Sequence, residues 1–84
     1  MIIKQEKITE IIRVVLIKFR DGAYWIESQQ FWTEPGMRWE VNSDGWRMMT
    51  AERCSDLEQA ERIFGEYVER EKRYAEIAIR MRTA

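Results

Sequence analysis

The chain has 84 residues, of which 45% are hydrophobic and 35% are charged, and this composition predicts a folded soluble domain rather than a disordered chain. Eighty-four residues cannot bury two separate cores, so we expect residues 1–84 to form a single domain. The 14 basic and 15 acidic residues give a net charge of −1. Such a balance provides no long-range field for nucleic acid or for an anionic membrane, and it disfavours both as partners.

The N-terminal pattern and the cysteine content indicate a cytoplasmic protein. "MIIKQEKITE" carries Lys4, Glu6 and Lys7 where a signal peptide would need an uninterrupted apolar run. The longest apolar run, "VVLI", is too short to cross a bilayer. The single cysteine, Cys54, excludes an internal disulfide and suits a reducing compartment.

Three turn-forming dipeptides divide residues 8–50 into segments that favour β-structure. Asp21-Gly22, Pro35-Gly36 and Asp44-Gly45 are typical turn sequences, and they would break any helix through the tryptophans that recur every seven residues from 25 to 46. The segments between them are rich in Ile, Val, Trp, Tyr and Phe. We therefore expect an antiparallel meander of four strands, Ile8–Arg20, Ala23–Thr33, Met37–Val41 and Trp46–Thr50.

The expected turns also set the register of this meander and assign its two faces. A two-residue turn at Asp21-Gly22 pairs Ile17 with Ile26, and the later turns place Trp39 opposite both Trp32 and Met48. The expected inner face contains Ile11, Val15, Ile17, Phe19, Tyr24, Ile26, Trp32, Trp39, Val41, Trp46 and Met48. The expected outer face contains Ile12, Val14, Leu16, Lys18, Trp25, Glu27, Gln29, Phe31, Arg38, Glu40, Arg47 and Met49.

A long helix is predicted over residues 56–82, which completes an α+β fold with the helix packed on one face of the sheet. "SDLE" is typical of a capping box formed by Ser55 and Glu58, and no proline follows. The helix would be roughly 40 Å long, so we expect its last two turns to extend beyond a small sheet, with Glu71 interrupting the apolar stripe where the overhang begins. The predicted stripe is Leu57, Ala60, Phe64, Tyr67, Val68, Ala75, Ala78 and Met81.

The sequence is poor in the groups from which catalytic and metal sites are built. It contains no histidine, no cluster of zinc ligands and no glycine-rich phosphate loop. Cys54 lies just before the predicted helix start, but no histidine is present to activate its thiol, so we interpret it as part of a connector. We expect no enzymatic activity, no cofactor and no metal ion.

Two apolar surfaces of the predicted fold favour a protein partner. Half of the expected outer face is apolar, which is more than a solvated sheet face needs, and Lys18 lies opposite Trp25 at a spacing that favours a cation–π contact. The end of the helix presents further apolar side chains beyond the sheet. The predicted partner-binding residues are Val14, Leu16, Lys18, Trp25, Phe31, Arg38, Arg47, Tyr74, Ile77 and Met81.

Residues 23–72 resemble the WGR domain in the order of their features. An aromatic strand, "AYWIESQQFW", is followed by "MRWEV", by "DGW" and by the helix "SDLEQAERIFGEYVEREK". The resemblance implies a nucleic-acid-contacting module that is usually attached to a larger enzyme. Trp39 stands at the place of the signature tryptophan, but Glu40 and Val41 replace the glycine and arginine of the signature, so the nucleic-acid role is not carried over.

The favoured interpretation is a non-enzymatic protein-binding module, a small adaptor or inhibitor, that forms a homodimer or binds a foreign protein. By fold-level analogy, free-standing domains of this size are frequent among accessory proteins of phages and mobile elements that act on host complexes. Coverage of the outer face by the N-terminal segment is a structural alternative. Nucleic-acid binding through the aromatic sheet face, as the WGR resemblance implies, is the alternative function.

Overall fold

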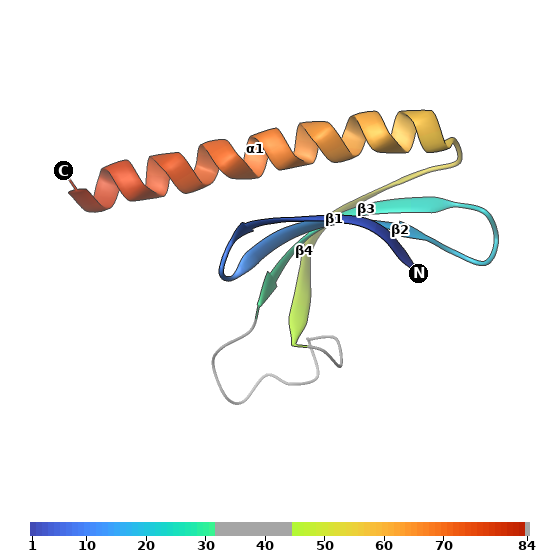
Figure 1. Ribbon diagram of the computed structural model, residues 1–84, viewed down its shortest axis with the longest axis horizontal. Helices are drawn as coiled ribbons and strands as arrows, with labels where there is room; N and C mark the ends of the chain where they lie inside the picture. Colours follow the sequence, from blue (N-terminus) through green and yellow to red (C-terminus); the bar gives the residue numbers. More distant parts are fainter. Residues whose placement is uncertain (32–44, 84) are drawn as a thin grey trace.

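A computed structural model of the chain describes residues 1–31 and 45–83, with side chains placed up to residue 81. One antiparallel sheet, in the order β1-β2-β3-β4, is crossed by a helix that covers one of its faces (Figure 1). The α+β prediction of four antiparallel strands and one C-terminal helix is confirmed. The elements are β1 (Ile2–Thr9), β2 (Ile12–Lys18), β3 (Tyr24–Phe31), β4 (Trp46–Cys54) and α1 (Leu57–Thr83).

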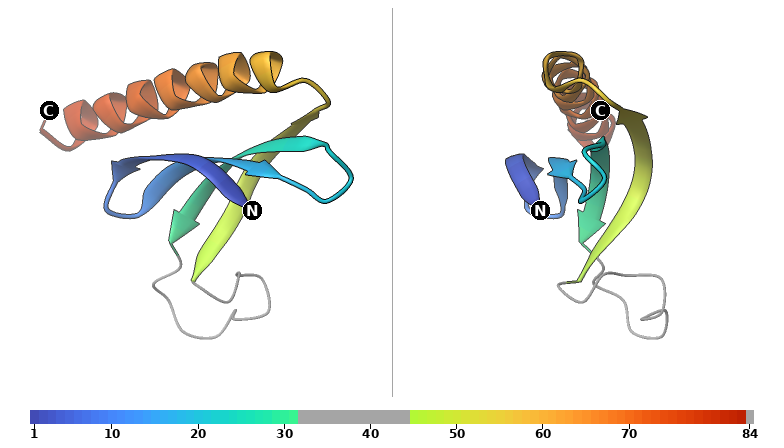
Figure 2. Two further views of the ribbon diagram at one scale, coloured as in Figure 1. Left: turned by 45° about the vertical axis from the view of Figure 1, so that its right-hand side comes forward. Right: turned by 90° about the vertical axis from the view of Figure 1, so that its right-hand side faces the viewer.

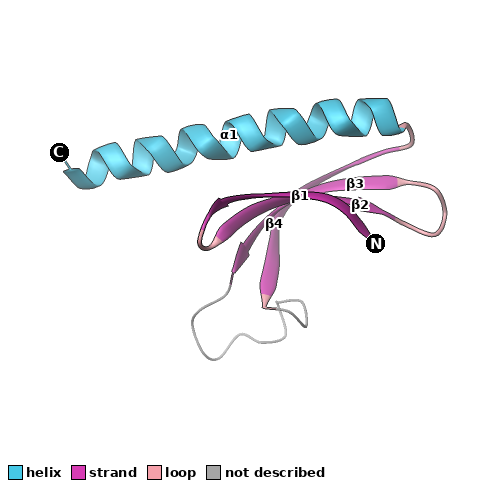
Figure 3. Cartoon of the chain, in the orientation of Figure 1, coloured by secondary structure: helices cyan, strands magenta, loops and turns pink. Residues whose placement is uncertain are grey.

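The first and last strands differ from the predicted ones. The predicted strand Ile8–Arg20 is wrong, because a turn at Glu10 and Ile11 separates β1 from β2 and makes the N-terminal residues an edge strand. The turn is held by the backbone N–H of Ile11, which donates to Thr9 Oγ1 at 3.2 Å. The hairpins on either side of β2 are visible in Figure 3.

β4 pairs directly with β3, which the predicted strand order did not anticipate. Phe31 lies opposite Trp46 and Tyr24 opposite Cys54. The nine residues of β4 supply partners along the whole of β3, which a five-residue segment could not do. The predicted strand Met37–Val41, and with it the expected pairs of Trp39, lies outside the described residues.

The β2–β3 hairpin has a three-residue loop, one residue longer than the predicted turn. The backbone N–H of Phe19 donates to the Ala23 carbonyl at 2.9 Å, and that of Gly22 donates to the Phe19 carbonyl at 3.1 Å. Gly22 has φ +86°, the left-handed conformation that closes a three-residue hairpin loop. Asp21 Oδ1 accepts a further bond from the Ala23 N–H at 2.9 Å, which fixes the loop from the inside.

This extra loop residue shifts the β2–β3 register by one and exchanges the faces of β2. Leu16 lies opposite Ile26, whereas Ile17 lies opposite Trp25. A shift of one residue moves a whole set of side chains to the other face of a strand. The predicted pairing of Ile17 with Ile26 is therefore wrong, and so is the inner-face assignment of Val15, which lies on the side away from α1.

The core lies between α1 and the sheet face that carries Leu16 and Ile26. In Figure 2, α1 runs along one side of a strongly curved sheet. Ile63 belongs to the core, although the predicted stripe omitted it, and Leu57 is 41% exposed although the stripe included it. The buried cluster consists of Val14, Leu16, Ile26, Ala60, Ile63, Phe64, Tyr67 and Val68.

Asp56, and not Ser55, caps the helix. The two carboxylate oxygens of Asp56 accept bonds from the backbone N–H groups of Glu58 and Gln59, both at 3.4 Å, and its carbonyl accepts from the Ala60 N–H at 2.9 Å. A carboxylate also interacts favourably with the positive end of the helix dipole, which a serine hydroxyl does not. The predicted capping residue is therefore wrong by one position.

We expect Asp56→Ala to lower the free energy of unfolding by about 1 kcal/mol, because it removes the acceptor for two N–H groups of the first turn. Urea denaturation followed by circular dichroism measures this loss. Ser55→Ala is the neighbouring control and should leave the midpoint nearly unchanged. A larger loss of stability for the Ser55 variant would show that Ser55, and not Asp56, is the capping residue.

The C-terminal third of α1 extends past the sheet, as predicted. Glu71 is buried and Ala75 is half-buried, whereas Ile77 and Met81 are 51% and 76% exposed. Figure 1 shows this end of the helix continuing beyond the strands. Within residues 1–31 and 45–83, no helix has the combination of length and apolarity needed to cross a membrane.

Candidate functional site

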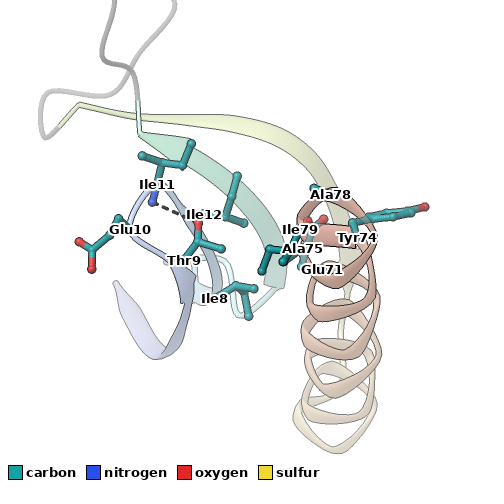
Figure 4. Close-up of a pocket in the computed structure, with 10 residues that line it drawn as sticks. All are labelled: Ile8, Thr9, Glu10, Ile11, Ile12, Glu71, Tyr74, Ala75, Ala78 and Ile79. Atoms are coloured by element: carbon teal, nitrogen blue, oxygen red, sulfur yellow. Dashed lines mark hydrogen bonds between the residues drawn. The ribbon is translucent and has the colours of Figure 1, made fainter. Parts of the chain in front are cut away.

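An apolar groove of about 450 Å³ lies between the β1–β2 turn and the C-terminal half of α1. Figure 4 shows the hairpin forming one wall and the helix the other. We call this site the hairpin–helix groove. Its lining residues are Ile8, Thr9, Glu10, Ile11, Ile12, Glu71, Tyr74, Ala75, Ala78 and Ile79.

A change in side-chain size along α1 explains why the groove is open at this point. Nearer the helix start, Phe64 and Tyr67 fill the space between helix and sheet. Further along, the same stripe carries Ala75 and Ala78, whose methyl groups are too small to reach the hairpin. Ile11, at the tip of the hairpin, is 41% exposed.

Glu71 is the unusual polar residue of the groove. It is 8% exposed, and within the described part of the chain it makes no hydrogen bond or ion pair. The neighbouring Lys72 turns to Glu6 instead, with Nζ 3.7 Å from Oε2. Burying a carboxylate costs free energy unless a donor or cation compensates it. The groove therefore offers an acceptor without a partner among apolar walls.

Two of the predicted partner-binding residues are in the core rather than on the surface. Val14 and Leu16 are 0% and 1% exposed and face α1, because the three-residue loop reverses the expected faces of β2. Lys18 lies at the end of the same strand, and its Nζ is 5.9 Å from the ring centre of Tyr24. The expected cation–π contact with Trp25 is wrong, since Trp25 lies opposite Ile17.

Trp25 and Phe31 do lie on the sheet face away from α1, as predicted. The half-buried Trp25 meets Phe19 edge to face, with ring centres 5.6 Å apart. Phe31 meets Trp46 in the same manner at 5.4 Å. Trp46 was predicted on the inner face, but its place opposite Phe31 puts it on this outer one. The aromatic groups form two separate pairs instead of one patch with Val14 and Leu16.

Arg13 connects the polar groups of this outer face. Its Nε donates to Gln29 Oε1 at 2.7 Å, its Nη1 donates to Gln5 Oε1 at 3.2 Å, and its guanidinium lies 4.3 Å from the Trp46 ring centre. Gln29 also donates to Glu27 Oε1 at 3.3 Å. These groups satisfy one another, so the cluster stabilises the sheet and offers no reactive group. This cluster cannot be predicted from the sequence, because cross-strand pairs depend on the register of the strands.

The remaining predicted partner-binding residues are distributed between the helix end and the far strands. Tyr74, Ile77 and Met81 are 58%, 51% and 76% exposed on α1, and Tyr74 lines the hairpin–helix groove. Arg47, in β4, is half-buried, and its place opposite Gln30 of β3 puts it on the face that carries Ile26, so its predicted outer-face position is wrong. Arg38 lies outside the described residues. The predicted partner-binding residues of α1 therefore lie on one surface, and those of the sheet lie elsewhere.

Acidic and cysteine side chains form no metal-binding group of three or more within residues 1–31 and 45–83. Cys54 was interpreted as part of a connector, but it is the last residue of β4; it is half-buried, and its Sγ donates to the Asp56 carbonyl at 3.3 Å.

Comparisons with known proteins found no relative of this chain. No protein-family model matches the chain, and neither the curated proteins nor the solved structures contain a match. The WGR resemblance therefore receives no support from the family comparison.

Proposed function

We propose that the chain is a non-enzymatic protein-binding module, an adaptor or inhibitor, that binds through the hairpin–helix groove and the adjoining end of α1. The observation that carries this proposal is the exposure of Tyr74 and Ile79, at 58% and 60%, in the lining of an apolar groove of about 450 Å³. Adjoining apolar groups of this kind are typical of surfaces that a partner covers.

The shape of the surface favours a helical partner. A groove with one helical wall accepts the apolar side of an amphipathic helix, whose side chains project at intervals of three and four residues. Tyr74 supplies an aromatic group at the rim, which is the residue type enriched where binding energy concentrates. Charged residues such as Glu10, with a side chain 93% exposed, surround the groove as a polar rim does.

Capture of proteins on the immobilised chain tests this proposal, with one disruptive variant and one matched control. Ile79→Asp places a charge in the groove wall, and we expect it to lower the capture of a specific partner by about tenfold or more, because charge at the centre of an apolar interface is strongly disfavoured. Ile2→Asp makes the same substitution at an exposed isoleucine far from the groove, near the N-terminus of β1, and should retain the partner.

The lysate should come from the organism that encodes the chain, and a captured protein should then be purified and titrated against all three forms. A second copy of the chain counts as a partner in this experiment. Equal binding by the Ile79 and Ile2 variants would show that the groove is not the binding surface. Absence of any partner, foreign or identical, would refute the proposed function.

A further inference from the structure

The charges in the lining of the hairpin–helix groove are both negative. Glu10 stands at the rim and Glu71 on the helical wall, beside Ala75 in Figure 4, and the described lining contains no lysine or arginine. Glu10 is paired with Lys7, whose Nζ lies 3.4 Å from its Oε2. Glu71 is 8% exposed and makes no hydrogen bond or ion pair within the described part of the chain. A buried carboxylate in this state favours the approach of a cation.

The two bases adjacent to Glu71 in the sequence are engaged elsewhere. The guanidinium of Arg70 lies 4.3 Å from the ring centre of Tyr67. Lys72 turns to β1, where its Nζ lies 3.7 Å from Glu6 Oε2. Neither base compensates Glu71, so a compensating cation is expected from a bound partner.

The surroundings of Glu71 favour arginine over lysine as this cation. A guanidinium forms two parallel N–H bonds to one carboxylate, and it is more weakly hydrated than an ammonium group. It also packs well on an aromatic ring, and Tyr74, one turn along α1 from Glu71, lines the groove with 58% of its surface exposed. Ala75 and Ala78 leave room for the apolar stem of the arginine.

The walls of the groove favour apolar residues beside the arginine. Ile11 on the hairpin and Ile79 on the helix are 41% and 60% exposed on opposite walls. The groove volume of about 450 Å³ falls within the range of about 300–1,000 Å³ that ligand pockets occupy. This volume accepts one long side chain together with part of its neighbours.

Resting on the proposed function, we propose that the hairpin–helix groove binds an arginine side chain of a foreign protein, flanked by apolar residues, and that Glu71 is the residue that selects it. The guanidinium pairs with the Glu71 carboxylate beside Tyr74, and the flanking apolar residues cover Ile11 and Ile79. Glu71 is thus a specificity-determining residue of the binding surface.

Selection from a random peptide library displayed on phage tests this inference without a known partner. The full chain is immobilised, and enriched peptides are synthesised and titrated by calorimetry. We expect the enriched peptides to share an arginine between apolar residues. Replacement of this arginine by citrulline, which keeps the shape and removes the charge, should weaken binding about tenfold or more. Replacement by lysine should weaken binding less than replacement by citrulline.

Variants of the chain show whether Glu71 receives the arginine. Glu71→Gln should weaken binding of the arginine peptide about tenfold or more, but it should leave the affinity for the citrulline peptide nearly unchanged, because both changes remove the same contact. Glu66→Gln is the matched control: it neutralises an exposed acid of α1 that does not line the groove, and it should leave both affinities nearly unchanged.

Urea denaturation separates this role of Glu71 from a structural one. Because its carboxylate is unpaired in the free chain, Glu71→Gln should leave the denaturation midpoint unchanged or raise it. If the variant is destabilised instead, the citrulline peptide still decides the test, since it needs no change in the chain.

Three outcomes overturn the inference: no enriched peptide, enriched peptides without arginine, and equal binding of arginine and citrulline peptides. If arginine-free peptides bind the chain and Ile79→Asp releases them, the inference fails while the proposed function stands. If Ile79→Asp retains every peptide and every captured protein, the groove is not the binding surface and the proposed function fails as well.

Discussion

Phe64→Ala is expected to lower the free energy of unfolding by about 3–5 kcal/mol, since it empties the middle of the core. Phe64 is 6% exposed between α1 and the sheet, and Lys4 Nζ lies 5.3 Å from its ring centre. Domains of this size have a total stability of only about 5–15 kcal/mol, so the variant loses a large part of its stability. Urea denaturation followed by tryptophan fluorescence measures the loss.

Phe31→Ala provides the matched control for this result. It removes the same side chain from a residue that is 38% exposed and contacts Trp46 on the face away from α1. An exposed aromatic pair of this kind contributes about 0.5–1.5 kcal/mol. If Phe31→Ala cost as much as Phe64→Ala, the layer between helix and sheet would not be the main source of stability.

Leu16→Ala is expected to cost about 2–5 kcal/mol, and Ile17→Ala clearly less, although the two residues are adjacent in β2. Leu16 is 1% exposed, lies opposite Ile26 and faces α1, whereas Ile17 is half-buried on the other face. Because neighbouring strand residues point to opposite faces, this pair of variants reports directly which face carries the core.

Denaturation midpoints for both variants settle the register of the β2–β3 hairpin. The two-residue turn predicted from the sequence places Ile17 inward and Leu16 outward, and it requires the opposite order of stability losses. A larger loss for Ile17→Ala would therefore contradict the three-residue loop.

The parts of the fold that could be predicted depend on local signals. The turn dipeptide Asp21-Gly22 lies in the loop between β2 and β3, as predicted, and the long helix α1 was recognisable from its apolar stripe without any tertiary information. The register could not be predicted, because Asp21-Gly22 is compatible with loops of two and of three residues. The hydrogen bonds around Phe19 and Gly22 decide between these loops, and they form only when both strands are in place.

Only the helical wall of the candidate site could be predicted from the sequence, because the hairpin wall depends on how distant strands pair. The overhang of the helix could be predicted from its length, and Tyr74, Ile77 and Met81 were predicted as partner-binding residues on that basis. Its hairpin wall requires β1, whose sequence "IIKQEKIT" mixes charged and apolar residues as an exposed edge strand does. Glu71 was recognised only as an interruption of the stripe, since its burial depends on where that hairpin ends.

The position of α1 after all four described strands has a consequence for how the chain matures on the ribosome. Val14, Leu16 and Ile26 are synthesised early, but the side chains that cover them come from residues 60–68. The nascent sheet therefore keeps an apolar face open to water until this part of the helix has left the exit tunnel, and it is most vulnerable to aggregation in that interval. The core can therefore form only late in translation, after Phe64 and its neighbours in α1 have been synthesised.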